Sequence, residues 1–578
     1  MSFARWLQDM KFSLALLGPL AGTRVPADPV NVLRDPWPGS AAGGESLVRG
    51  KAVHAGMSRQ IGHGVWSSHE LTTVWPASFR DWFQGFSWLR DLRELGTENA
   101  RLAGRALITE WIMRPVNETP LRNPSVTGAR IGAWLGHYDF FLASADETFR
   151  RKVMTRIVTE ARTIPPQLPD GTHDCRPLRA LKGLLAAGLA APDHGRLMAR
   201  FMGLIDAELD ASILPDGWHA SRSPETQFQV LRELAEMRLM LQNARIPLPT
   251  NLAAAVERMT PVLRAMRHGD GTLALFNGTV CHTPKLIDLV IARASPRGQV
   301  LARSMSEGRF LRLALENTLL LVDAGVPAPD GYDQQAHAGA LSFEFSSGKQ
   351  GIVVNCGDSG SPAWHKALRD APAHSVLIPD HARSVEWTED DRIFSRPSVT
   401  CEQISAPGAL LADLSLDGFC PAGAGTWKRR FYLSDEGRDL RGEDRLEGGD
   451  GRSFVLRFHL HPDVRVEAEE HDILLHLPEE TWRFRTDGLA AIEDSVWFGG
   501  EQRRDIKQIV VVPDIVPEVR KEQAPEKPKQ GGKPASSGVE IAEGEALPDP
   551  AVLASPAEEP LPPRRASAVR WAFTRLHD

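Results

Sequence analysis

The spacing of apolar residues changes between about residues 325 and 335, from a helical period to a strand period. From about 80 to 325, apolar side chains recur three or four positions apart in stripes that end at Gly or Pro clusters, as in successive packed helices. Phe79, Phe83 and Phe86 form one such stripe. The stripes share no repeated sequence, which favours a helical toroid over a regular solenoid.

From about 335 to 515 the period is two. Leu341, Phe343 and Phe345 alternate with polar residues, as in a half-buried strand. Turns such as Gly448–Gly451 separate further runs of this kind. Strands at this spacing predict a large antiparallel sandwich.

The two periods together predict an α+β multidomain protein with an N-terminal (α/α) toroid followed by a C-terminal antiparallel β-sandwich. We expect an irregular N-terminal segment over 1–60, the toroid over 61–330 and the sandwich over 331–516. Pro, Glu, Lys, Gly, Ala and Ser dominate 517–563, which predicts a disordered linker. The last segment, 564–578, is expected to dock back on the body.

Length, net charge and cysteine content exclude some classes of protein but do not identify the function. A chain of 578 residues is too long for one ordinary core, and its net charge of -7 argues against non-specific binding to nucleic acid or an anionic membrane surface. A local basic cleft for an acidic sugar remains open. The five cysteines contain no CxxC, so neither a disulfide framework nor a zinc ribbon is indicated and reduced thiols are expected.

The N-terminus has two interpretations. Phe12–Gly22 follows Lys11 and fits a short signal-peptide core, whereas Trp6, Met10 and Leu14 fall at helical spacing and fit an amphipathic first helix. No apolar run approaches the ~18 residues of a transmembrane helix. The sequence fixes neither a compartment nor an oligomeric state.

One loop between two predicted helices concentrates polar and aromatic groups. Ser223 and Pro224 start the second helix as N-cap and first helical residue. Ahead of them, His219 is the candidate general base, because its unperturbed pKa near ~6.5 suits proton abstraction at neutral pH. Arg222 is the candidate carboxylate clamp, since its planar fork pairs bidentately with a carboxylate. Trp218 is the candidate aromatic substrate contact, and the alternative is that all three are ordinary loop residues.

A second turn-rich loop ends the helical region. It contributes Asp270 and Asn277 as candidate substrate-binding residues, and its alternative is a plain connector.

Three residues of the strand region are candidate metal ligands. His337 and His374 lie about one hairpin apart, with Asn355 and Cys356 between them. Imidazole and thiolate are good zinc ligands, whereas an amide oxygen is a poor one. We therefore expect weak or absent zinc, with His337 and His374 as its ligands and Cys356 as a candidate third. The alternative is a hydrogen-bonded histidine pair.

The order of several motifs over roughly residues 30–515, together with the final strand, resembles the heparinase II/III-like polysaccharide lyases, in a bacterial subgroup. The motifs are Asp35-Pro36-Trp37-Pro38-Gly39, Trp88-Leu89-Arg90-Asp91-Leu92, Asp216-Gly217 with Ser223-Pro224, the Asp270 loop, His337 through Gly357, Ala373-His374-Ser375, Arg441-Gly442-Glu443-Asp444-Arg445-Leu446 and His459-Leu460-His461-Pro462. The resemblance implies a toroid and a sandwich with substrate in the cleft between them. It implies β-elimination, in which the C5 proton of a uronate is removed and the C4 oxygen is expelled.

The chain departs from that resemblance at the residues that would carry the chemistry. The family uses an Asn or His after the middle helices, a Tyr shortly after the Ser-Pro pair, and the first His of a His-x-His. Here the first region reads His173–Arg176, the second reads Glu225–Gln227, and Gln335 replaces the histidine. The Gln335 amide can hydrogen-bond a substrate carboxylate, but it cannot transfer a proton at neutral pH. His337 is kept and is a candidate substrate-binding residue, and in relatives it tends to serve a structural metal.

The resemblance therefore implies a polysaccharide lyase that acts on an acidic, uronate-containing glycan. The alternative is a catalytically degraded glycan-binding or envelope-assembly protein on the same fold. A third alternative, a hydrolase with paired carboxylates, needs a spatial pairing that the sequence does not reveal. The expected partner is an acidic polysaccharide or oligosaccharide, not a nucleic acid. The resemblance implies the cell envelope or periplasm, and without a clear signal peptide the cytoplasm stays open.

Overall fold

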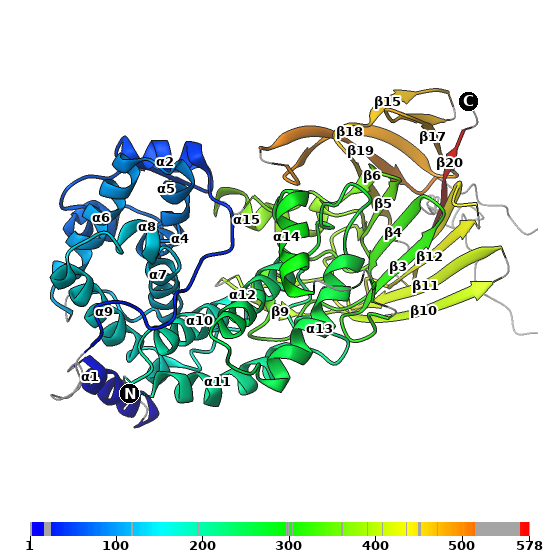
Figure 1. Ribbon diagram of the computed structural model, residues 1–578. Helices are drawn as coiled ribbons and strands as arrows, with labels where there is room; N and C mark the ends of the chain where they lie inside the picture. Colours follow the sequence, from blue (N-terminus) through cyan, green and yellow to red (C-terminus); the bar gives the residue numbers. More distant parts are fainter. Residues whose placement is uncertain are drawn as a thin grey trace, which may run out of the picture.

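The computed structural model shows a helical domain beside a β-sandwich (Figure 1). It describes residues 3–16, 25–116, 119–193, 196–295, 298, 300–302, 304–359, 362–389, 391–406, 408–434, 436–448, 452–470, 472–500, 502–514 and 567–576. The predicted class, a helical region followed by antiparallel sheets, is confirmed. Among these residues, no helix has the length and apolar character needed to cross a membrane.

The helices of the N-terminal part vary from one turn to five. They are α1 (Phe3–Leu16), α2 (Ala41–Val48), α3 (His69–Thr73), α4 (Ala77–Gln84), α5 (Leu89–Leu95), α6 (Glu98–Met113), α7 (Pro124–Gly136), α8 (Tyr138–Phe141), α9 (Glu147–Ala161), α10 (Cys175–Ala190), α11 (Leu197–Ser212), α12 (Pro224–Asn243), α13 (Thr250–Ala265) and α14 (Pro284–Ala294). Most of them begin at a side-chain cap. Asn123, Ser223 and Thr283 cap α7, α12 and α14, each followed by a proline at the first helical position.

Helices α7, α10 and α12 pack side by side, with α9, α11 and α13 against them on the outside (Figure 1). Glycines set the closest approach of this inner row. A Cβ added to Gly183 of α10 would lie 2.3 Å from Cα of Gly128 on α7, so a side chain on Gly183 would push the two helices apart. The inner row therefore depends on backbone contact between α7 and α10.

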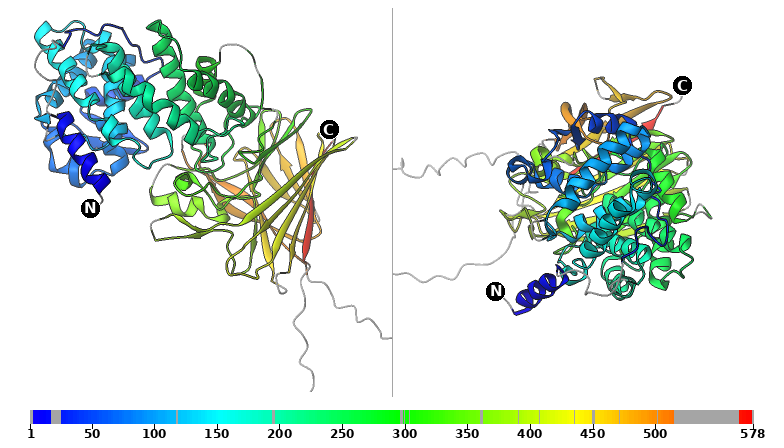
Figure 2. Two further views of the ribbon diagram at one scale, coloured as in Figure 1. Left: turned by 90° about the horizontal axis from the view of Figure 1, so that it is seen from below. Right: turned by 60° about the vertical axis from the view of Figure 1, so that its left-hand side comes forward.

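The described residues before Ile61 hold more regular structure than the sequence predicted. Helices α1 and α2 and the hairpin β1 (Lys51–His54) with β2 (Met57–Gln60) lie within them. The hairpin turns at Ala55 and Gly56, both at positive φ, which suits a tight turn. Helix α1 stands at the outer side of the helical domain (Figure 2). Trp6, Met10 and Leu14 are 53%, 40% and 58% exposed on it. The remainder of the predicted signal-like stretch, from residue 17, lies outside the described residues.

The sandwich consists of two large antiparallel sheets. One has the order β10 (Ser398–Ala406), β11 (Ala409–Asp417), β12 (Thr426–Ser434), β13 (Asp439–Glu447), β20 (Ala568–Arg575), β17 (Thr481–Thr486), β16 (Ile473–His476), β15 (Arg465–Ala468). The other has the order β18 (Leu489–Trp497), β19 (Arg504–Val512), β14 (Phe454–Leu460), β6 (Gln350–Val354), β5 (Phe343–Ser347), β4 (Thr318–Asp323), β3 (Phe310–Leu315), with β7 (Leu377–Pro379) also beside β14. The short pair β8 (Glu386–Trp387) and β9 (Ile393–Ser395) and the helix α15 (Pro362–Arg369) lie between the strands in sequence.

Two boundaries differ from the expected ones. Strands β3 and β4 belong to the sandwich, although residues up to 330 were assigned to the helical domain. At the other end, the segment after the predicted linker forms β20, which pairs with β13 on one side and β17 on the other. The predicted linker, 517–563, falls outside the described residues.

A buried carboxylate holds β20 in the sandwich core. Asp444 of β13 accepts hydrogen bonds from the indole nitrogens of Trp427 (2.7 Å) and Trp571 (2.8 Å) and pairs with Arg429 at 2.7 Å. The Arg429 guanidinium also donates to the carbonyls of Leu341 and Ser375, each at 2.8 Å. This one cluster joins β12, β13 and β20 to two loops of the facing sheet.

We expect Trp571→Phe to lower the free energy of unfolding by about 1–3 kcal/mol, because it keeps the aromatic ring but deprives a buried carboxylate of one donor. Chemical denaturation measures the change. Trp497→Phe is the matched control, since the Trp497 indole nitrogen has no hydrogen-bond partner among the described residues. An equal loss in both variants would contradict the role given to the Trp571–Asp444 bond.

Candidate functional site

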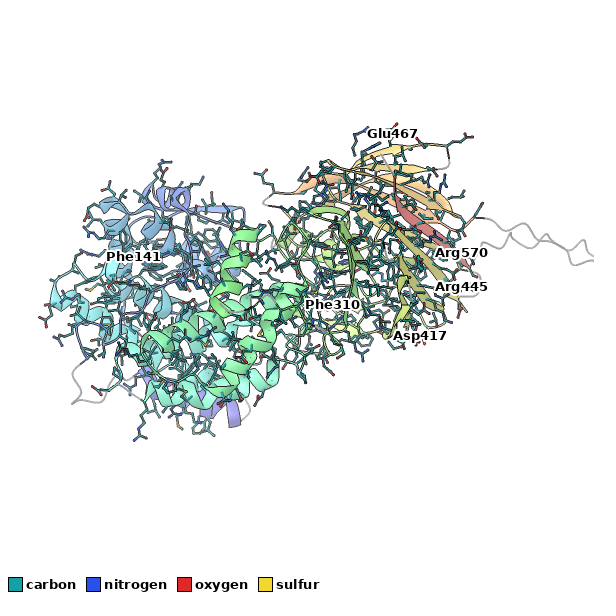
Figure 3. The ribbon with its side chains drawn as sticks, turned by 45° about the vertical axis from the view of Figure 1, so that its right-hand side comes forward. Phe141, Phe310, Asp417, Arg445, Glu467 and Arg570 are labelled. Atoms are coloured by element: carbon teal, nitrogen blue, oxygen red, sulfur yellow. The ribbon has the colours of Figure 1, made fainter. Side chains whose placement is uncertain are left out.

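The helical domain and the sandwich meet at an apolar joint around Trp218 and Phe310. The two rings stack at 4.7 Å, and Phe310 lies where the two domains adjoin (Figure 3). Trp218 is 0% exposed, and a Cβ on Gly308 would come within 2.1 Å of its ring. The prediction that Trp218 contacts substrate is therefore wrong, because the indole is a core side chain of the joint.

Arg222 is the polar centre of the joint. Its guanidinium donates to the carbonyls of Gly308 (2.8 Å), Arg309 (3.2 Å) and Val326, and it pairs with the carboxylate of Asp323 at the end of β4. A buried guanidinium that is committed to four partners is not free to receive a substrate carboxylate. The structure thus contradicts the predicted clamp and gives Arg222 a cross-domain structural role.

Three further predicted residues gather around Arg222. The Asn277 amide donates to the Arg222 carbonyl (3.0 Å), and its oxygen accepts from the backbone N–H of His337 (3.2 Å). The side chain of Gln335 reaches Gly278, where an added Cβ would lie 2.2 Å from its amide oxygen. The sequence thus selected residues that do assemble in space. Asn277 is nevertheless buried, and its amide is used inside the protein.

His219 is enclosed next to this group. It is 0% exposed, Nδ1 lies 2.9 Å from the Ser221 hydroxyl, and Nε2 has no hydrogen-bond partner among the described residues. Burial, together with the nearby His173, lowers the pKa of His219 to about 3. A general base must reach the proton that it abstracts. The position of His219 does not support that role.

Sequence reasoning missed two titratable groups here, Tyr332 beside His219 and Glu208, whose charge acts on Tyr332. Tyr332 stacks on His173 with ring centroids 4.4 Å apart and donates its hydroxyl to the carbonyl of Ala211 (2.7 Å). On α11, burial raises the pKa of Glu208 to about 7, with Asp170 and Asp174 adding to the shift. The rarity of tyrosine, with only three in the chain, was the one feature of the sequence that could have singled out Tyr332. It lies on the β-domain side of the joint, and not shortly after the Ser-Pro pair.

Asp270 lies in a separate turn. Its carboxylate accepts from the backbone N–H (2.8 Å) and hydroxyl (2.7 Å) of Thr272, which is the geometry of a self-capped turn. The structure does not bring Asp270 to the group around Arg222.

The predicted metal ligands form a pair. The rings of His337 and His374 lie 5.2 Å apart, both are buried, and none of their four ring nitrogens has a hydrogen-bond partner among the described residues. Asp358 approaches His337 Nε2 at 3.9 Å. The Cys356 thiol faces His459 (3.7 Å) and Ser495 instead. The described part of the chain holds no group of three or more His, Cys, Asp or Glu side chains arranged for a metal ion, so these residues do not fit a complete zinc site.

A cavity of about 610 Å³ opens inside the helical domain, and we call it the helical-domain cavity. Its wall combines charged, polar and aromatic side chains, among them Asp35, Trp37, His54, Asp81, Trp82, Trp88, Arg90, Asn123, Arg176, Arg179, Lys182, Gln229, Arg232, Glu233 and Glu236. A volume of this size suits a small oligosaccharide, and aromatic rings stack on sugars. Of the tryptophans grouped in the sequence, Trp66, Trp75 and Trp88 are buried, whereas Trp82 is only partly buried.

A chain of hydrogen bonds along α12 and α10 links the joint to this cavity. Near the joint, Glu225 binds His282 (2.7 Å) and Gln229 (2.5 Å). Gln229 accepts from the Cys175 thiol (2.8 Å). Deeper in, Glu233 pairs with Arg179 (3.1 Å) and Lys182 (2.7 Å).

Lys182 then reaches Glu236 (2.9 Å), which also accepts the indole N–H of Trp37 (2.7 Å). These acceptors recur on one face of α12 at positions 225, 229, 233 and 236. Their partners on α10 lie 54 residues away and Trp37 lies 199 residues from Glu236, so sequence spacing alone could not pair them.

The loop that carries Gln335 also reaches the wall of the cavity. Arg176, at the start of α10, donates to the side chain of Gln334 at 2.5 Å and pairs with Asp174 at 2.8 Å. The two domains thus meet beside the cavity through a polar contact in addition to the apolar joint.

The matches to known proteins cover both the helical domain and the sandwich. Residues 298–535 match the family model described as heparinase II/III-like, C-terminal. A curated relative, FtsZ-localized protein C of Caulobacter vibrioides, is 28% identical over 538 residues, which span 84% of this chain and 87% of the relative.

Among solved structures, a heparinase III matches with a TM-score of 0.66 at 10% identity, covering 99% of this chain and 89% of the other. A heparan sulfate lyase from Pedobacter heparinus matches with a TM-score of 0.51 at 12% identity, covering 99% and 88%. At these identities the structural matches establish the fold, including its arrangement of helical domain and sandwich.

We expect Arg222→Met to lower the free energy of unfolding by about 3–5 kcal/mol, because it leaves the buried Asp323 carboxylate without its counter-ion. Burial already raises the pKa of Asp323, and removing Arg222 raises it further. A folded state that binds this proton more tightly than the unfolded state loses stability as pH rises through the folded pKa.

The deficit of Arg222→Met should therefore be larger at pH 8 than at pH 5.5, as measured by urea unfolding at both pH values. Arg222→Met combined with Asp323→Asn is the control, and it should recover part of the loss. A deficit that is the same at both pH values and in both variants would contradict the ion-pair explanation.

Proposed function

Since the chain belongs to the heparinase II/III-like family, whose C-terminal model its residues 298–535 match, we propose that it binds an acidic glycan in the helical-domain cavity without cleaving it by β-elimination. The carrying observation is a contrast within one molecule. Charged side chains of both signs and aromatic rings line a cavity of about 610 Å³, whereas His219 and Arg222, the predicted base and clamp, are buried at the joint.

β-Elimination makes three demands. The carboxylate must be neutralised, a base must take the C5 proton, and an acid must protonate the leaving oxygen. The predicted base, His219, is fully buried, and the predicted clamp, Arg222, is committed to Asp323. Gln335 occupies the position of the family histidine and cannot transfer a proton. This distribution favours the binding function over the lyase function.

The name of the curated relative favours a second role. That protein is localised with FtsZ, and its match runs through 84% of this chain, including most of the helical domain that the family model leaves out. We propose that this chain also acts at the division site together with FtsZ. The similarity to this relative therefore favours the envelope-assembly function over the lyase function.

The glycan proposal is tested with purified full-length protein and a panel of polyuronates and glycosaminoglycans. We expect isothermal titration calorimetry to detect binding to at least one acidic oligosaccharide. We expect no rise in absorbance near ~232 nm, where the unsaturated uronate product of β-elimination absorbs. The same oligosaccharide with reduced carboxyl groups is the matched control and should bind more weakly. A sustained rise at that wavelength would restore the lyase function, and absence of any binding would refute the glycan function.

The division-site role makes a separate prediction. A fluorescent fusion should gather at midcell with FtsZ and disperse when FtsZ is depleted. Purified protein should also sediment with FtsZ polymers and stay in the supernatant with unpolymerised FtsZ. A fusion whose distribution does not respond to FtsZ depletion would contradict this role.

A further inference from the structure

Among the described residues, Arg232 is a cation that makes no direct ion pair, although Glu233, Glu236 and Asp35 lie near enough to oppose the lowering of its pKa. It projects from α12 into the wall of the helical-domain cavity, where its guanidinium carbon lies 5.0 Å from the centre of the Trp37 ring. Among the described residues it forms no hydrogen bond and no ion pair. The stacking on Trp37 orients the planar guanidinium without using its N–H donors. Those donors remain available to a ligand.

The acidic groups around it are already engaged. Glu233 and Glu236 pair with Lys182 at 2.7 and 2.9 Å, and Asp35 pairs with Arg90 at 2.8 Å. Asp81 accepts from the Asn123 amide at 3.1 Å. Five acidic and five basic side chains line the cavity, and among the described residues Arg232 is the one of these basic side chains that pairs directly with no carboxylate.

Arg232 nevertheless stays charged. Burial and the neighbouring Arg90 lower its pKa to about 10, which is still far above neutral pH. A partly buried charge without a partner is destabilising, so its retention is costly unless a ligand offsets it.

The surrounding wall suits a sugar. Trp82 stacks on His54 with ring centroids 4.4 Å apart and planes 2° apart, and both residues line the cavity. Burial lowers the pKa of His54 to about 4, so its ring is neutral at pH 7. Gln229 and Asn123 add neutral amides to the lining. An aromatic face, neutral hydrogen-bonding groups and one cation form a pattern that fits a singly charged sugar unit.

We propose that the Arg232 guanidinium, held over the Trp37 ring, is the subsite that binds the anionic group of one sugar unit in the helical-domain cavity, and that this group is the carboxylate of a uronic acid. The planar carboxylate matches the two parallel donors of the guanidinium fork, which a sulfate ester matches less closely. This inference deepens the proposed glycan function and rests on it. It makes Arg232 the residue that selects an acidic sugar over a neutral one.

The test compares wild type, Arg232→Gln and Arg200→Gln. Arg200 is an exposed arginine of α11, so its variant removes the same charge from outside the cavity. Calorimetry with a uronate oligosaccharide should show about 10–100-fold weaker binding in Arg232→Gln and no change in Arg200→Gln, the range expected for a charge-assisted bidentate contact. Glucuronate, glucose 6-sulfate and glucose, tested singly, distinguish a carboxylate from a sulfate and from a neutral sugar.

A second readout separates binding from structure. Without ligand, Arg232→Gln should melt at the same temperature as wild type or higher, because it removes an unpaired charge. A lower melting temperature would show that Arg232 is structural and would overturn the subsite, as would equal binding of glucose and glucuronate. Preference for glucose 6-sulfate would overturn the assignment to a carboxylate.

The remaining outcomes separate this inference from the glycan function. If the oligosaccharide binds wild type and Arg232→Gln equally, the subsite is wrong and the glycan function stands. If no oligosaccharide binds but glucuronate raises the melting temperature of wild type and not of Arg232→Gln, the subsite stands and the polymer function fails. If neither ligand has any effect, both are overturned.

Discussion

The ion pair between Arg222 and Asp323 fixes how the two domains meet. One guanidinium binds a carboxylate at the end of β4 and three backbone carbonyls on the sandwich side, while its own carbonyl accepts from Asn277. A buried ion pair offsets the cost of desolvating its two charges only when their remaining hydrogen-bonding groups also have partners. The loops at residues 219–223, 276–279 and 333–338 therefore have little freedom, and the wall of the helical-domain cavity nearest the joint inherits that rigidity.

Buried arginines recur as organising centres elsewhere. Arg130 pairs with Glu160 at 2.7 Å inside the helical domain, and Arg429 pairs with Asp444 at 2.7 Å inside the sandwich. Glu160 takes a second partner in Arg156 and a third in the Trp111 indole. In each case the protein supplies a complete shell of partners. Arg232 departs from this pattern, since among the described residues it has no hydrogen bond and no ion pair, and Arg312 of β3 is another arginine of this kind.

The sequence predicted the order of the domains because the period of apolar residues changes from helical to alternating, and that change is local information. It also predicted the start of α12, since Ser223 and Pro224 act through neighbouring atoms. The candidate residues failed where function depends on exposure. Nothing in the neighbouring sequence shows that Trp218 packs against Phe310 of β3, or that His219 is fully buried beside Tyr332.

The cavity was harder still to predict. The polar face of α12 is visible as a spacing, but an exposed helix face and a cavity wall have the same spacing. Only the partners on α10, which the fold brings to that face, distinguish the two. The unpaired state of Arg232 is a property of all its neighbours together, and a linear sequence does not contain it.

The place of β20 has a consequence for the order of events during synthesis. Strand β19 ends at Val512, whereas β20 begins at Ala568 and lies between β13 and β17, both of which precede it in the chain. While the ribosome is still translating the segment between them, β13 and β17 each present an unsatisfied edge, and Asp444 lacks the indole of Trp571. The sandwich can close only after β20 has left the exit tunnel, so the nascent protein passes through a stage in which its helical domain is complete and its β-domain is open.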